Sequence, residues 1–234
     1  MDQISFARDR SEVQVNEFVR SVYNWMCIGL GITALVALYV SGNETFVRMV
    51  FGNSLIFFAL IIAELALVFS ISSMVGRMSA GTATTLFVIY SALNGITLSF
   101  IFLAYARASI VSTFFICSAT FLACSIYGWT TKKDLTSWGS FLMMGLIGVI
   151  IASLVNIFIR SNAVTMIVSY IGVIVFVGLT AYDTQKMKDM ALTQPAGLDG
   201  GVIRKGAILG ALSLYLDFIN LFLMLLRIFG RSQD

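Results

Sequence analysis

Carboxyl groups occur at three places in long apolar stretches of this sequence. Glu64 and Asp217 each lie near the middle of such a stretch, and Asp183 closes another. In a membrane-spanning helix, ionisable side chains face the interior of a bundle or a water-filled cavity, and they mark ion or proton pathways. The alternative interpretation is a packing hydrogen bond between helices for Glu64 and Asp217, and contact with water at a helix end for Asp183.

Two further polar side chains could act together with these acids. Asn220 follows Asp217 by three positions, so the two share a helix face. Carboxylate and amide oxygens are the ligands that a hard cation prefers, so Asp183, Asp217 and Asn220 could bind such a cation transiently. Arg227 either extends to the membrane interface or pairs with a buried acid, for which Glu64 is the available residue.

Several kinds of chemistry are excluded by the residues that the chain lacks. It contains no histidine, which excludes His-ligated metal sites, Ser-His-Asp triads and Cys-His pairs. Asn94, Asn156 and Asn220 are more typical of hydrogen bonds between membrane helices than of sites. No protease motif accompanies Tyr182-Asp183, and no feature indicates an organic cofactor. We therefore expect a protein that is not an enzyme.

Apolar side chains dominate the composition, with 59% of the 234 residues hydrophobic and 12% charged. A soluble domain of this composition could not cover its surface with polar groups, whereas lipid favours apolar outer faces. The net charge is +3, and no basic cluster alternates with aromatic residues, which excludes nucleic acid as a partner. The expected partner is the lipid bilayer.

Seven apolar stretches are long enough to cross a bilayer, whose hydrocarbon core of about 30 Å needs about 20 helical residues. None of them alternates with period two, and continuous helices satisfy their own backbone groups in lipid. The sequence therefore predicts an all-α membrane protein with seven transmembrane helices. The expected spans are Val22–Val40, Leu55–Met74, Thr82–Ala104, Ile110–Trp129, Ser140–Ile159, Ala163–Tyr182 and Gly206–Ile228.

Short polar breaks separate most of these spans, so we expect one transmembrane domain over residues 22–230. Residues 1–21 are expected to form a cytoplasmic N-terminal tail, and residues 231–234 a short C-terminal tail. The longest break, Asp183–Lys205, contains Pro195 and three glycines. This composition predicts a flexible strap.

The distribution of lysine and arginine predicts the orientation in the membrane. With a cytoplasmic N-terminus, the inner segments hold ten of the 15 basic residues and the outer segments hold five. An odd number of spans then places the C-terminus outside. If the seventh stretch re-enters the membrane instead of crossing it, the C-terminus is cytoplasmic.

Motifs in four of the spans resemble those of the Bax inhibitor-1 family. Tyr182-Asp183-Thr184-Gln185 is similar to the end of that family's sixth span, and Tyr215-Leu216-Asp217-Phe218-Ile219-Asn220 to its last span. Gly95-Ile96-Thr97-Leu98-Ser99 resembles its third span, and Tyr23-Asn24-Trp25-Met26 resembles its bacterial inner-membrane branch. The resemblance covers residues 22–230. It implies three hairpin pairs around a central seventh helix, in the inner membrane of a bacterium.

The resemblance also implies an activity, because characterised bacterial members conduct a pH-dependent calcium leak. The family's paired aspartates correspond to Asp183 and Asp217, and its buried acid and last-span arginine correspond to Glu64 and Arg227. The calcium-conducting member has several consecutive basic residues at the inner end of the second span, one of which latches the aspartates. This chain has Arg77 alone at that place.

Two functions are compatible with this sequence. The first is a passive pathway for cations, mainly calcium, that is gated by protonation of Asp183 and Asp217. The alternative is a regulator that moves no ion and binds other membrane proteins, such as a membrane protease or a stress protein. Ion flux in vesicles that contain the purified protein separates the two.

Overall fold

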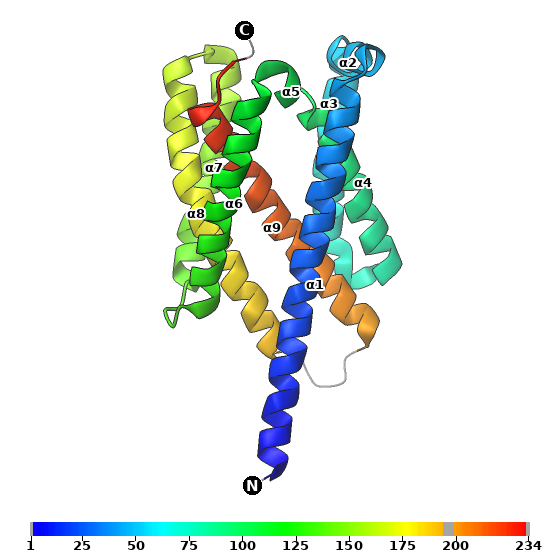
Figure 1. The fold of residues 1–234 in the computed structure, drawn as a ribbon, viewed down its shortest axis with the longest axis vertical. Coiled ribbons are helices and arrows are strands. Elements are labelled where there is room, and N and C mark those ends of the chain that lie inside the picture. Colours follow the sequence, from blue (N-terminus) through cyan, green and yellow to red (C-terminus); the bar gives the residue numbers. More distant parts are fainter. Residues whose placement is uncertain (1, 194–198, 233–234) are drawn as a thin grey trace. The chain divides into compact units, whose positions relative to one another are not determined.

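Helices make up nearly all of the computed structural model, which describes the backbone of residues 2–193 and 199–232 and the side chains of residues 15–193 and 199–232. The prediction of an all-α protein is confirmed for this part of the chain. In chain order the elements are α1 (Asp2–Ser41), α2 (Glu44–Phe51), α3 (Ser54–Met74), the 3-10 turn η1 (Val75–Arg77), α4 (Ala80–Leu98), α5 (Ile101–Ala104), α6 (Arg107–Thr130), α7 (Thr136–Ile159), α8 (Asn162–Thr193) and α9 (Gly200–Phe229) (Figure 1).

Seven spans among the described residues are long and apolar enough to cross a membrane, as the sequence predicts. They are formed by α1 from Val15 onward, α3 with η1, α4 with α5, and the single helices α6 to α9. The most buried of these spans is α9. In its apolar 18-residue segment 72% is buried, against 44% for the corresponding segment of the α4–α5 span.

Several helices extend beyond the predicted spans. Helix α1 begins at Asp2, within the predicted tail, and Val15 and Phe18 are already buried. Helix α8 continues to Thr193 because residues 183–193 contain no glycine or proline and are rich in helix-forming Lys, Met, Ala and Leu. The prediction of a flexible strap is therefore wrong for residues 183–193 and 200–205. Pro195 and Gly197 lie outside the described residues.

Two connections also differ from the sequence-based expectation. The third span is not one helix, because Ser99 makes a tight turn after α4: its backbone nitrogen and its hydroxyl both donate to Ile96 O, at 3.2 and 2.7 Å. The break between the first two spans contains the short helix α2, whose first turn is capped by the side chain of Asn43. Its charged residues Glu44 and Arg48 form an exposed ion pair of 3.2 Å.

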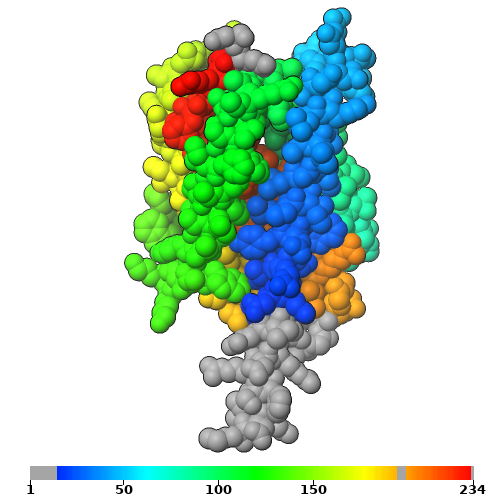
Figure 2. Space-filling view, in the orientation of Figure 1, coloured from blue at the N-terminus to red at the C-terminus, as the bar shows by residue number. Residues whose placement is uncertain are grey.

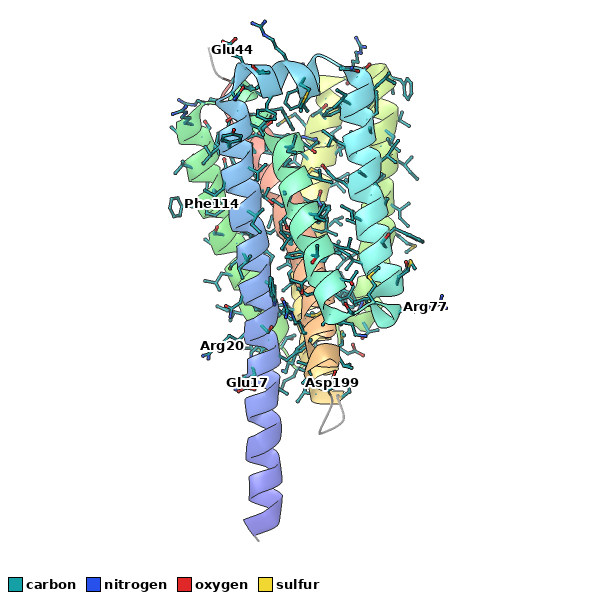
Figure 3. All side chains as sticks on the ribbon, turned by 90° about the vertical axis from the view of Figure 1, so that its right-hand side faces the viewer. Glu17, Arg20, Glu44, Arg77, Phe114 and Asp199 are labelled. Atoms are coloured by element: carbon teal, nitrogen blue, oxygen red, sulfur yellow. The ribbon has the colours of Figure 1, made fainter. Side chains whose placement is uncertain are left out.

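The chain forms two compact units. The first unit contains Met1–Ala104 and Asp189–Tyr215, and the second contains Tyr105–Lys188 and Leu216–Asp234. Each unit thus holds three of the first six spans and one half of α9. In the first unit α1 packs mainly against α4, and α3 also packs against α4. Figure 3 shows that Glu44 lies at one end of the first unit, and that Arg20, Arg77 and Asp199 lie toward the other end.

In the second unit, α6 has one apolar outer face and one buried face. The outer face carries exposed residues such as Val111, Phe115, Leu122 and Ile126. Figure 2 shows α6 (green) at the surface of this unit. Such a face is suited to contact with lipid chains.

Candidate functional site

Asp183 and Asp217 both belong to the second unit, where they lie on α8 and α9. Asp217 is only 5% exposed, and Asp183 is half-buried. The two carboxyl groups are close enough for the charge of Asp183 to act on Asp217. The sequence suggested that Asp183 lies at the end of its helix. In the structure it does not, because α8 continues to Thr193. Contact with water at a helix end therefore does not explain this residue.

Two glycines let neighbouring helices approach α8 directly before Asp183. A Cβ atom at Gly128 of α6 would overlap the carbonyl oxygen of Ala181, and one at Gly139 of α7 would overlap the ring of Tyr182. Only glycine leaves room for these contacts without displacement of backbone or ring. Neither residue could be recognised from the sequence, since isolated glycines in apolar spans are common and carry no signal of their own.

Polar contacts fix α8 on the other side of Asp183. The side chain of Gln185 accepts a hydrogen bond from Leu135 N and donates one to Lys133 O, both at 2.8 Å. Lys188 donates to Trp129 O at 2.7 Å, and its ammonium group lies 5.4 Å from the centre of the Trp129 ring. These contacts hold α8 against the connection between α6 and α7. They give the Asp-Thr-Gln motif a structural role that the sequence did not indicate.

One carboxyl oxygen of Asp217 has no protein partner. Oδ2 is buried and accepts no hydrogen bond from any described residue. Asn220, which the sequence placed on the same face, donates from Nδ2 to Leu216 O of its own helix at 2.8 Å. Buried polar atoms are paired in the great majority of cases, so an exception points to water, an ion or a functional proton.

The described residues hold no cluster of three or more His, Cys, Asp or Glu side chains that could bind a metal ion. A stable calcium site takes six to eight oxygen ligands. Two carboxyl groups can instead exchange protons and attract a passing cation, which is the chemistry that this pair supports.

Glu64 lies in a second polar network, within the first unit. Its carboxyl oxygens accept hydrogen bonds from Asn94 Nδ2, at 3.2 Å, and from the hydroxyl of Thr97. Asn94 Oδ1 in turn accepts from the hydroxyl of Tyr215 at 3.0 Å, and Tyr215 OH lies 2.6 Å from Thr33 Oγ1. The network joins α1, α3, α4 and the first half of α9. The sequence singled out Glu64 and Asn94, but not Thr33, Thr97 or Tyr215.

The remaining candidates take different places. Arg227 is exposed and belongs to the second unit, whereas Glu64 belongs to the first, so their ion pair stays a prediction. Arg77 is exposed at the end of η1 in the first unit, and its role as a latch also stays a prediction.

The expectation of interhelical bonds is correct for Asn94 and for Asn156, which donates to Thr165 Oγ1 of α8 at 2.7 Å. Asn220 instead bonds to its own helix.

Seven helices among the described residues that are long and apolar enough to cross a membrane define a polytopic helical membrane protein. A sequence model described as inhibitor of apoptosis-promoting Bax1 matches residues 15–234. The chain therefore belongs to the Bax inhibitor-1 family.

Curated relatives match over nearly the whole chain. Inner membrane protein YbhL of Escherichia coli (strain K12) is 52% identical over 232 residues, which cover 97% of this chain and 99% of the relative. An uncharacterized protein of Borreliella burgdorferi is 46% identical over 233 residues, 99% of each chain. An uncharacterized membrane protein of Streptococcus pyogenes serotype M1 is 40% identical over 226 residues, 96% of each chain.

Proposed function

We propose that this protein is a passive cation pathway of the bacterial inner membrane, that calcium is its main ion, and that Asp183 and Asp217 make it sensitive to pH. Two observations support the proposal: Asp217 is 5% exposed, and its Oδ2 has no hydrogen-bond partner among the described residues. The name of the Escherichia coli relative supports the location.

The mechanism follows from the interaction of two carboxyl groups. Two such groups close together do not ionise independently, so they share a proton, and their titration belongs to the pair. When the proton leaves, the pair gains a negative charge in the interior of the protein, where charges interact more strongly than in bulk water. This charge attracts cations and makes α8 and α9 repel each other at this level. The rate of the leak therefore depends steeply on pH.

Calcium flux into vesicles tests this proposal. The purified protein is reconstituted into liposomes that contain a calcium-sensitive dye, next to protein-free liposomes and to the Asp183→Asn/Asp217→Asn double variant. We expect flux in the wild type and a strong loss in the double variant. Asp189→Asn is the matched control, because Asp189 is an exposed acid on the same helix; it should conduct like the wild type. Wild-type flux no greater than in protein-free liposomes would contradict the proposal and favour the regulator that moves no ion.

A further inference from the structure

Three buried side-chain oxygens without a hydrogen-bond partner occur in the described part of the second unit. They are Thr113 Oγ1 and Ser125 Oγ of α6 and Asp217 Oδ2 of α9. Thr113 is 1% exposed, and Ser125 and Asp217 are each 5% exposed. Buried polar atoms are rarely left unpaired, so three in one unit call for a common explanation.

The two hydroxyl groups differ from other hydroxyls of the same helix. Thr120 and Thr130 donate to the carbonyl oxygens of Ile116 and Ile126, four residues earlier, at 2.8 and 2.7 Å. This is the usual way in which a Ser or Thr in a membrane helix satisfies its hydroxyl group. Thr113 and Ser125 do not use it, so their hydroxyl groups are available to something other than their own backbone.

Contacts between α6 and α9 place the middle of α6, between Thr113 and Ser125, beside the residue that follows Asp217. Cys117 donates from Sγ to Phe218 O at 3.7 Å, and the ring centres of Phe121 and Phe218 are 5.4 Å apart. Phe218 directly follows Asp217, so the carboxyl group belongs to the turn of α9 that packs against the middle of α6. Thr113 and Ser125 are 12 residues apart in the sequence, which is about 18 Å along a helix.

We infer that the buried face of α6, from Thr113 past Cys117 to Ser125, lines the hydrated path along which the cation passes Asp217. This inference rests on the proposed function and names the wall of the pathway. Water molecules in the interior bridge polar atoms that lack protein partners, and a file of them would satisfy Thr113, Ser125 and Asp217 together. Hydroxyl and carboxylate oxygens are also suitable temporary ligands for a partly dehydrated cation.

Cys117 provides a direct probe of this path, because its thiol is fully buried on the same face. A silver ion binds a thiol with release of its proton, so that one S–H bond is replaced by one S–Ag bond. The test compares calcium flux before and after exposure to Ag⁺. The background is a variant without cysteine (Cys27→Ala/Cys117→Ala/Cys124→Ala), into which single cysteines are placed at 113, 117, 119 or 125.

We expect Ag⁺ to block flux when the cysteine is at position 117, 113 or 125, and to have no effect on the variant without cysteine. Ala119→Cys is the matched control: residue 119 is exposed, two positions from Cys117 on the same helix. Flux that persists with Ag⁺ at Cys117, or that is blocked equally at position 119, would overturn the inference while leaving the proposed function intact. No flux in the untreated wild type would instead reject the proposed function.

A second variant tests the path without any reagent. Thr113→Val keeps the shape of the side chain and removes the hydroxyl group. We expect flux to fall about tenfold, which corresponds to ~1.4 kcal/mol in the barrier, whereas resistance to unfolding should not decrease. Thr113→Ser restores the hydroxyl and should restore flux. Unchanged flux in Thr113→Val, or a loss of stability in parallel with the loss of flux, would show that Thr113 acts in packing alone.

Discussion

Asp217 occupies a position in which a carboxyl group opposes folding. It is buried, and most of the apolar segment of its helix α9 is buried as well. Its Oδ2 has no hydrogen-bond partner among the described residues. Residues that serve packing are seldom of this kind, whereas functional residues often reduce the stability of the fold that carries them. The stability of Asp217 variants therefore separates a functional from a structural role.

Asp217→Leu should leave resistance to unfolding unchanged or raise it by about 1–3 kcal/mol, since it removes an unpartnered buried polar group and keeps a similar volume. The measurement is reversible unfolding of the purified protein in bicelles. Phe218→Ala is the control: Phe218 is 4% exposed, and such a truncation costs about 3–5 kcal/mol. A loss of that size in Asp217→Leu would show that Asp217 holds the helices together.

The network around Glu64 makes the opposite prediction, because its side chains are paired. Asn94→Leu removes the donor to Glu64 and the acceptor of Tyr215, and should cost about 1–3 kcal/mol; Tyr215→Phe should cost about 1 kcal/mol. The double variant should lose less stability than the sum of the two single losses, with a difference of about 0.5 kcal/mol or more, as expected for groups in one network. Additive losses in the same unfolding assay would mean that Asn94 and Tyr215 act independently.

At the residue scale, the sequence identified the acids but not their surroundings. Glu64, Asp183 and Asp217 could be found because a charged residue in an apolar span is rare. Thr113 and Ser125 could not, because a Ser or Thr in a membrane helix most often bonds to its own backbone. Which hydroxyl groups depart from this habit depends on the neighbouring helices, and one span contains no information about them.

At the scale of elements, apolar length predicts where a helix lies in the membrane but not where it ends. Gly200 and Gly201 suggested a loop, yet they form the first turn of α9, where Asp199 Oδ2 accepts a hydrogen bond from Gly201 N at 3.1 Å. Glycine is tolerated in a first turn when an acidic side chain caps it. Helix α8 continued through polar residues for a similar local reason, since each of them is compatible with a helix.

The close approach of α6 to α8 predicts a second effect at this scale. Gly128→Ala should lower the free energy of unfolding by about 1–3 kcal/mol, because the added methyl group meets a backbone oxygen that cannot move aside. Gly148→Ala is the control, since nothing lies within 4 Å of the position its Cβ would take. Equal stability of the two variants would show that α6 and α8 do not need this contact.

At the scale of the molecule, the division into two units was not visible in the sequence. Hydropathy separates seven spans, but it does not say which of them pack together. Helix α1 packs mainly on α4, although α3 follows α1 more closely in the chain. Both units take one half of α9, and the boundary between Tyr215 and Leu216 falls inside the helix. Tyr215, which belongs to the Glu64 network, and Asp217 are two residues apart on α9 but belong to different units.

The orientation of the whole molecule is a further prediction. Ten basic residues on the inner segments against five on the outer ones favour a cytoplasmic N-terminus and a C-terminus outside. A C-terminal fusion to a protein that fluoresces only in the cytoplasm should therefore stay dark, and an N-terminal fusion should be bright. A bright C-terminal fusion would show that the seventh span does not cross the membrane.

A shared proton on Asp183 and Asp217 controls the movement of cations in the function that we propose. Its most direct test is calcium flux through the reconstituted protein as a function of pH, in the wild type, Asp183→Asn and Asp217→Asn. A single remaining carboxyl group has no acidic partner with which to share a proton, so the charge that the wild type gains when the shared proton leaves is not gained at that pH. We predict a steep pH profile for the wild type and a much flatter one for Asp217→Asn. An equally steep profile in all three proteins would contradict the account.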